Sequence, residues 1–118
     1  MWKRALAGYE IALVPYHPDT SRVLSNLGRC YADQGQFDEA GRILKQALLG
    51  YQQLQKGHEK DFHDTQYTLG EVLERCGRFS KAENAFADAL AGYETLLGLD
   101  DPETVDAARR LDHVRGKE

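Results

Sequence analysis

The 118-residue sequence has few cysteines, prolines and methionines: two, three and one, respectively. Cys30 and Cys76 make no C-x-x-C or other metal-ligand spacing, and both lie within strongly helical patterns. We therefore interpret them as buried, reduced thiols and not as a disulfide or a metal site. The low proline count and the apolar content of 42% are typical of an ordered globular protein and exclude a disordered chain.

Long apolar runs are also missing. A membrane span needs roughly 18 uninterrupted apolar residues, and the N-terminus lacks the apolar segment of a signal peptide. We therefore expect no membrane partner and a cytoplasmic location. The formal net charge is −4, and Lys and Arg are scattered among acidic residues. No nucleic-acid partner is expected, because phosphate binding requires a gathered basic surface.

Motifs for catalysis are missing as well. The sequence has no G-x-S-x-G, no phosphate-binding glycine loop and no cysteine beside a histidine, so we predict no enzyme activity and no cofactor. His58, Glu59, His63 and Asp64 lie close together in sequence, and Glu59 and His63 have the i, i+4 spacing of helical metal ligands. No further ligands follow at a recognised spacing, so no metal site is predicted, and a metal protein stays the alternative.

The chain does contain an internal repeat with a period of 42 positions. One block recurs three times, as ALAGYE at 5–10, ALLGYQ at 47–52 and ALAGYE at 89–94. A second block, Leu-Gly followed by Gly-x-Phe, occurs at 27–37 and 69–79, and a third occurs as HPDT at 17–20 and DPET at 101–104. Three blocks with one period indicate a helical-repeat or related solenoid architecture.

Within each period the apolar residues follow helical spacing, as Leu24, Leu27 and Tyr31 do. Gly35 and Gly77 fall where the chain must reverse direction, which favours a left-handed backbone. Alternation with period two is missing, so no strands are predicted. We predict about six helices, at 2–14, 18–34, 37–55, 60–76, 79–97 and 102–115.

Small residues recur where the helices of a pair are expected to cross. Gly28 and Gly70 are predicted to face Ala40 and Ala82, respectively, on the following helix. Such small residues let two helix backbones approach closely. The sequence therefore predicts antiparallel helix pairs that stack and cover one another's apolar faces.

These features resemble the tetratricopeptide repeat, whose pattern has Leu-Gly and Tyr on its first helix and Ala, a large apolar residue and Ala on its second. The two matching sets are Leu27, Gly28, Tyr31, Ala40, Leu44 and Ala47, and Leu69, Gly70, Leu73, Ala82, Phe86 and Ala89. The period of 42 instead of the usual 34 resembles the kinesin-light-chain branch, which also supplies sensor regions of nucleotide-binding immune-type receptors. The sequence departs from the pattern at Leu73, which replaces an aromatic residue, and at 60–62, where Lys-Asp-Phe replaces Pro-Asp-Thr.

The resemblance implies an all-α, right-handed superhelical solenoid of antiparallel helix pairs, forming one domain over residues 1–118. Its register assigns a lone second helix to 1–14, one repeat to 18–55, another to 60–97 and a lone first helix to 102–115. We interpret this as two complete repeats from a longer array, natural or engineered.

The family also implies a function, namely a scaffold or sensor that binds a protein or peptide in a concave groove lined by the first helices. Carried over by position, the groove residues are Arg22, Asn26, Arg29, Asp33, Asp64, Tyr67, Glu71, Arg75, Arg109, Arg110 and His113. Arg22, Asn26, Arg29 and Asp33 are spaced by three and four, which independently places them on one helix face. Tyr67 is expected to act as an aromatic anchor, and a merely solvated charged face is the alternative.

Relatives that clamp a peptide's C-terminal carboxylate use Lys and Asn, whereas this chain has Ser25, Arg29 and Thr68 at the matching positions, so that activity is not predicted. The alternative function is a self-assembling structural fragment that forms head-to-tail or swapped homo-oligomers through uncapped ends. The residues expected at these ends are Trp2, Leu6, Val105, Ala108, Leu111 and Val114.

Overall fold

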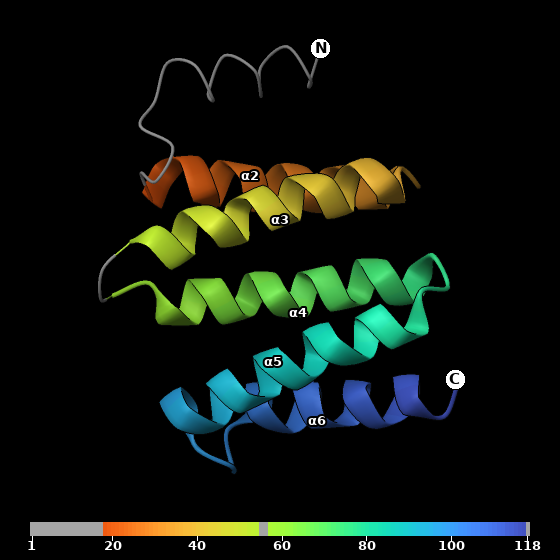
Figure 1. Ribbon diagram of the computed structural model, residues 1–118. Coiled ribbons are helices and arrows are strands. Elements are labelled where there is room, and N and C mark those ends of the chain that lie inside the picture. Colours follow the sequence, from red (N-terminus) through yellow and green to blue (C-terminus); the bar gives the residue numbers. More distant parts are fainter. Residues whose placement is uncertain (1–17, 55–56, 118) are drawn as a thin grey trace. The chain divides into compact units, whose positions relative to one another are not determined.

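The computed structural model describes residues 18–54 and 57–117, which form five α-helices and no strand (Figure 1). They are α2 (Pro18–Asp33), α3 (Phe37–Gln53), α4 (Glu59–Arg75), α5 (Phe79–Leu97) and α6 (Pro102–Arg115). Each predicted boundary of these helices is right to within two residues, and the predicted all-α helical-repeat fold is confirmed. The helix predicted at 2–14 lies outside the described residues. None of the five is long and apolar enough to cross a membrane.

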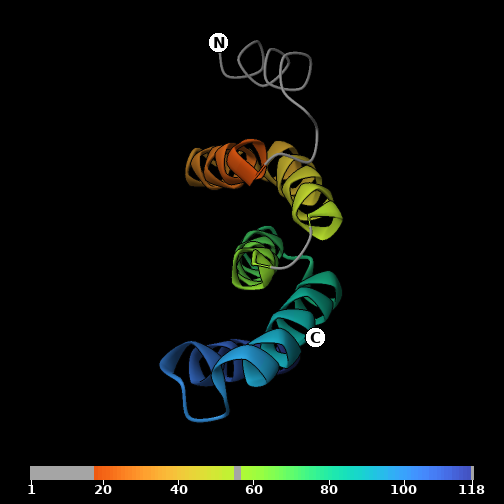
Figure 2. The same ribbon diagram turned by 90° about the vertical axis from the view of Figure 1, so that its left-hand side faces the viewer.

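The chain divides into two compact units, residues 1–58 and 59–118. In the described part of the first unit, α2 and α3 pack against each other as a helical hairpin. In the second unit, α5 packs against both α4 and α6 (Figure 2). The second unit therefore brings a complete helix pair and one further helix into a common core.

The turns within both pairs end their first helix in the same way. Gly35 and Gly77 have φ angles of +81° and +84°, as the sequence predicts. The following amides, of Gln36 and Arg78, donate to the carbonyl oxygens of Tyr31 and Leu73 at 2.9 Å. This arrangement is the Schellman motif, in which a left-handed residue lets the last carbonyl groups of a helix find donors.

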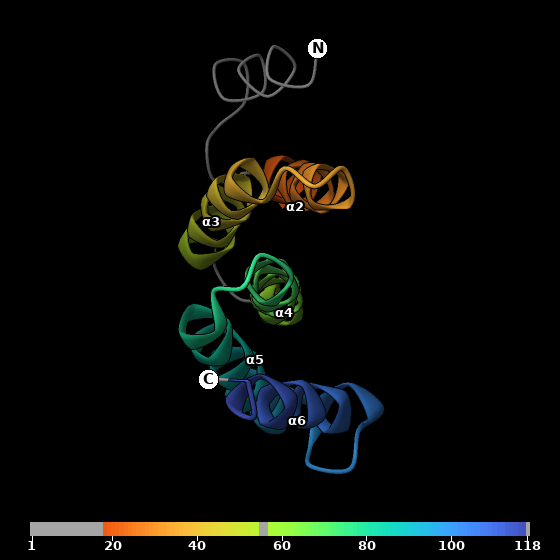
Figure 3. The ribbon, with the colours of Figure 1, turned by 90° about the vertical axis from the view of Figure 1, so that its right-hand side faces the viewer.

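The start of α6 depends on side-chain chemistry. Figure 3 shows the loop that joins α5 to α6. Asp101, the last residue before α6, accepts a hydrogen bond from the amide of Glu103 at 2.9 Å. Pro102 follows as the first helical residue, where its missing N–H group leaves no bond unmade. The Asp-Pro-Glu-Thr sequence thus begins a helix at 102, as expected.

Both helix pairs cross closely at a glycine. A Cβ on Gly28 would lie 2.6 Å from Leu44 Cγ and 3.3 Å from the carbonyl oxygen of Ala40, the residue predicted to face it. A Cβ on Gly70 would lie 2.8 Å from the Phe86 ring. Large apolar side chains, and not the methyl groups of Ala40 and Ala82, therefore fill the space that the glycines leave. The two alanines are nevertheless fully buried.

The cores of the two units use the repeated apolar positions. In the first unit Ile43, Leu44 and Ala47 on α3 are 0% exposed, while in the second Ala89, Tyr93 and Ala107 form a buried cluster. The interpretation of the cysteines as buried is wrong. Cys30 is exposed and Cys76 is partly exposed, and both are free thiols.

Candidate protein-interaction surface

A row of polar contacts joins α4 to α6 in the second unit. Its four rungs are Lys60 with Glu103, Tyr67 with Asp106, Glu71 with Arg110, and Glu74 with His113. The row forms because α4 and α6 both pack against α5, which brings side chains of the two helices within reach of each other. We call this row the α4–α6 ladder.

Arg110 is the best-connected residue of the α4–α6 ladder. Its guanidinium lies 2.7 Å from Glu71 Oε2 and 5.9 and 5.8 Å from the ring centres of Tyr67 and Phe86. The rings of Tyr67 and Phe86 meet edge to face, with centroids 5.4 Å apart. The burial of Arg110 lowers its pKa, but the neighbouring Tyr67, Glu71 and other acidic groups outweigh this and raise it. Arg110 is thus a permanent cation inside the unit.

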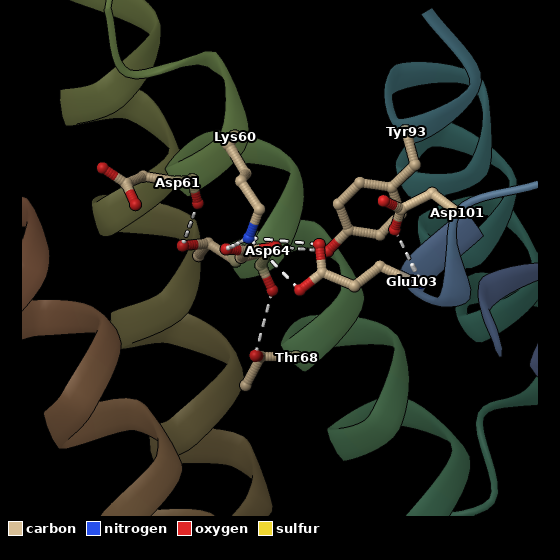
Figure 4. Close-up of polar contacts among 8 residues, drawn as sticks. Lys60, Asp61, Asp64, Thr68, Tyr93, Asp101 and Glu103 are labelled. Atoms are coloured by element: carbon tan, nitrogen blue, oxygen red, sulfur yellow. Dashed lines mark hydrogen bonds and ion pairs between the residues drawn. The ribbon is translucent and has the colours of Figure 1, made fainter. Parts of the chain in front are cut away.

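At the N-terminal ends of α4 and α6, Lys60 lies between two carboxylates (Figure 4). Its Nζ is 3.1 Å from Asp64 Oδ2 and 3.1 Å from Glu103 Oε2. Tyr93 of α5 donates its hydroxyl proton to Asp64 Oδ1 at 2.5 Å. Burial raises the pKa of Tyr93 well above its ordinary value, and the hydrogen bond to Asp64 adds to the rise. Asp64 therefore holds α4 to α5, and Lys60 links α4 to α6 through Glu103.

The hydroxyl groups of two buried threonines on α4 are satisfied within the helix. Thr65 Oγ1 donates to the carbonyl oxygen of Asp61 at 2.9 Å, and Thr68 Oγ1 donates to that of Asp64 at 3.0 Å. Thr68 is 5% exposed, and its hydroxyl already donates to a carbonyl oxygen of its own helix. Its hydroxyl is poorly placed to bind a partner.

The groove residues predicted on α2 lie as the spacing indicates. Arg22, Asn26, Arg29 and Asp33 are all exposed. Arg22 forms an ion pair with Asp19 at 3.3 Å on the same helix, and both side chains are more than 60% exposed, at 63% and 64%. Exposed ion pairs of this kind contribute little to stability, so Arg22 can exchange its partner at low cost.

The groove residues predicted on α4 and α6 are mostly engaged within the unit. Asp64, Tyr67, Glu71 and Arg110 belong to the contacts described above, and His113 Nε2 lies 3.4 Å from Glu74 Oε2. Tyr67 is half-buried with its hydroxyl hydrogen-bonded to Asp106, so it is a packing residue and not a free anchor.

Two other predicted residues, Arg75 and Arg109, are exposed. Arg109 makes no hydrogen bond or ion pair with the described part of the chain. These two arginines are the exposed cations among the groove residues predicted in the second unit.

Sequence reasoning missed the intramolecular partners Lys60, Glu74 and Glu103. Glu71 and Arg110 are 39 residues apart, as are Tyr67 and Asp106. A search for oppositely charged residues separated by slightly fewer than 42 positions would have found the Glu71–Arg110 pair. The prediction treated the polar face of each first helix separately and did not consider the polar face of the next first helix as its neighbour.

The predicted apolar end on α6 requires a correction. Leu111 and Val114 are 5% and 0% exposed, because they share one helix face with Thr104 and Ala107, and that face packs against α5. Val105 is 37% exposed and Ala108 is partly exposed. Trp2 and Leu6 lie outside the described residues.

The rest of the exposed face of α6 is polar. Asp112 occupies the repeat position of Gly28 and Gly70, and it is exposed, as is Arg109. A glycine at this position lets a second helix approach in α2 and α4, whereas a carboxylate there favours contact with water. This face of α6 is therefore poorly suited to a closely packed second helix.

The histidine cluster near the second linker does not converge. In residues 18–54 and 57–117, no group of three His, Cys, Asp or Glu side chains is arranged to hold a metal ion. The ring of His58 stacks on Tyr51 at a centroid distance of 6.4 Å, while His63 Nδ1 lies 2.8 Å from Gln66 Oε1. The two histidines thus serve different local contacts.

Antiparallel helix pairs with a shared 42-residue period and glycine crossings define a helical-repeat protein. Residues 1–53 and 64–103 each match a sequence profile described as the tetratricopeptide repeat. The chain is therefore assigned to the tetratricopeptide-repeat proteins. No curated protein matches it significantly. Repeats of this family generally mediate protein–protein interactions, and the fold is a non-catalytic scaffold.

Proposed function

We propose that the chain is a scaffold or sensor module that binds a protein or peptide through the exposed polar faces of its first helices, α2 in the first unit and α4 and α6 in the second. The observation that carries the proposal is the line of exposed polar residues on α2. Arg22, Asn26, Arg29 and Asp33 follow one face of that helix and present both signs of charge and an amide. Such a face suits an extended peptide that is held by hydrogen bonds and alternating charges.

The second unit contributes less charge than its sequence suggests. The carboxylates of Asp64 and Glu71 and the cation of Arg110 are already paired. Arg75 and Arg109 are the exposed cations among its proposed groove residues. The partner we propose therefore has mixed charge, with acidic side chains that meet Arg29 and Arg75.

The remaining parts of the proposal rest on the sequence. Residues 18–55 and 60–97 are taken as two repeats of a single domain, and the 42-residue period supports the kinesin-light-chain-like branch. A cytoplasmic location is proposed because both cysteines are free thiols. The absence of nucleic-acid and membrane partners is proposed from the scattered charge.

A binding measurement with charge-reversed variants tests the groove assignment. A partner is first captured from the native cytosol and purified, and its affinity is then measured by calorimetry. Arg29→Glu and Arg75→Glu should each weaken binding by about 0.5–1 kcal/mol, the range for exposed charge pairs. Arg110 is unsuitable for this test because it supports the fold of the second unit.

The matched controls are Lys45→Glu and Lys81→Glu, which make the same change at exposed positions on α3 and α5, the second helices. They should leave the affinity unchanged. Equal losses from both sets of variants would remove the groove assignment.

The alternative is self-association through the helix ends, with Trp2 and Leu6 on one side and Val105 and Ala108 on the other. Light scattering over a concentration series tests it, since the mean mass should rise with concentration. A mass that stays at one chain would end this alternative.

A further inference from the structure

An open cavity of about 480 Å³ lies between α4 and α5 in the second unit. It is lined by Glu59, His63, Gln66, Asp88, Ala91, Gly92, Thr95 and Leu96. None of these is a predicted groove residue. The cavity is therefore a surface feature separate from the proposed binding face.

The cavity is shaped by His63, whose imidazole lies directly over Gly92. A Cβ at position 92 would overlap the ring, so the missing side chain of Gly92 makes room for it. The ring is fixed by the contact of its Nδ1 with Gln66 at 2.8 Å and by edge-on contacts with Phe62 and Tyr93 at centroid distances of 5.3 and 6.3 Å. The cavity thus has a preformed shape, which lowers the entropic cost of binding.

The lining combines acidic and apolar side chains. Glu59 and Asp88 supply carboxylates from the two helices, and Ala91 and Leu96 supply methyl groups. Leu96 is 42% exposed, and it is the exposed large apolar side chain among the lining residues. Asp88 is exposed and makes no hydrogen bond or ion pair in the described part of the chain, and the lining residues include no Lys or Arg.

We propose that this cavity binds a lysine or arginine side chain of a protein partner. Such side chains combine an apolar stem with a cationic end. The stem would lie along Ala91 and Leu96, and the cation would meet the carboxylate of Asp88. An acidic peptide or a nucleic acid does not fit, because both would bring negative charge to Glu59 and Asp88. The proposal does not depend on the groove function, since the two sites use different residues.

An NMR titration of the full chain tests the proposal. The ¹⁵N-labelled protein is titrated with the peptide acetyl-Ala-Lys-Ala-Lys-Ala-amide. The backbone amide signals of Ala91, Gly92, Thr95 and Leu96 should shift and approach saturation. A peptide with norleucine in place of both lysines keeps the stem but removes the charge, and it should cause no saturable shift.

Two variants on α5 decide whether the cavity carboxylate is responsible. Asp88→Asn should weaken the lysine peptide about two- to fivefold, the loss expected for one exposed ion pair. Glu94→Gln removes the same charge at an exposed position of α5 outside the cavity and should change nothing. Asp88 is exposed, so neither variant should impair folding. Equal effects of the two variants, or shifts confined to α2, α4 and α6, would overturn the proposal.

The groove variant Arg29→Glu separates this proposal from the proposed function. It should leave the shifts at Gly92 and Leu96 intact, even if it abolishes binding of the groove partner. A clearly tighter binding of the lysine peptide to this variant would show that the cationic peptide binds at the groove, where the change adds negative charge, and would refute the cavity site.

Discussion

The guanidinium of Arg110 on α6 lies 2.7 Å from the carboxylate of Glu71 on α4, although α5 separates the two helices in the chain. The residues are 39 positions apart, three fewer than the repeat period. Three residues of helix correspond to about 4.5 Å along its axis. Three rungs of the α4–α6 ladder thus pair an α4 residue with an α6 residue almost one turn before its repeat equivalent, whereas Lys60 and Glu103 are 43 positions apart.

A double-mutant cycle at this pair measures its contribution. Arg110→Ala should lower the free energy of unfolding more than Glu71→Ala, because it also removes cation–π contacts with Tyr67 and Phe86, worth about 0.5–1 kcal/mol at exposed sites. The coupling energy of the two changes, from urea unfolding, should be about 0.5–1 kcal/mol.

The control cycle is Arg22 with Asp19, whose side chains are 63% and 64% exposed. Its coupling should be at most a few tenths of a kcal/mol, because solvent screens this pair more strongly. If both cycles gave the same coupling, the α4–α6 ladder would have no special role in stability.

The close helix crossing at Gly70 leads to a second prediction. Gly70→Ala places a methyl group 2.8 Å from the buried Phe86 ring, and overpacking of this kind costs about 1–3 kcal/mol. Gly41→Ala on α3 is the matched control, because no atom lies within 4 Å of its added Cβ. That change should stabilise the chain by about 0.5–1 kcal/mol through helix propensity. Thermal unfolding followed by circular dichroism measures both, and a stabilised Gly70→Ala would contradict the crossing.

The turn after α4 provides a third prediction. Gly77 has φ of +84°, and a side chain in this left-handed region costs about 1–2 kcal/mol. Gly77→Ala should therefore destabilise the chain by about that amount. Gly116→Ala is the comparison, since Gly116 has φ of −68° and only ordinary contacts for a Cβ. A loss of stability as large at Gly116 as at Gly77 would mean that strain at positive φ is not the cause.

The sequence was sufficient to predict the helices because each one carries local signals that agree. Gly35 and Gly77 end helices with positive φ, and Pro102 begins one, so the boundaries follow from backbone chemistry alone. The repeat also predicted which helices pair. Each 42-residue unit has two helices with an apolar stripe, and packing them against each other and against the neighbouring unit buries both stripes.

The candidate site was harder to predict because its side chains interact across helices. Tyr67 has the spacing of a groove residue, yet its ring packs on Phe86 and its hydroxyl bonds Asp106. Val114 belongs to an apolar stripe that was expected to lie uncovered at the end of the chain, yet it is fully buried. A helix pattern shows which residues share a face, but whether a neighbouring helix or water covers that face depends on packing.

The hydrogen bond from Tyr93 to Asp64 makes stability depend on alkaline pH. Burial raises the pKa of Tyr93 above its ordinary value of 10.0, and Asp64 raises it further. Unfolded Tyr93 loses its proton near pH 10, whereas the folded state keeps it at higher pH. Above pH 10 the unfolded state therefore binds fewer protons, so this contribution to stability is complete below pH 10 and falls as pH rises further.

Tyr93→Phe tests this linkage while it keeps the ring. At neutral pH the variant should be less stable by about 1 kcal/mol, because it lacks the hydrogen bond. Urea unfolding from about pH 8 to 11 should give a constant difference between the two proteins up to pH 10. Above pH 10 the difference should shrink, by up to about 1.4 kcal/mol per pH unit until it vanishes or reverses. A difference that stays constant across the range would show that the phenol of Tyr93 ionises equally in both states, and that its bond to Asp64 does not hold the proton.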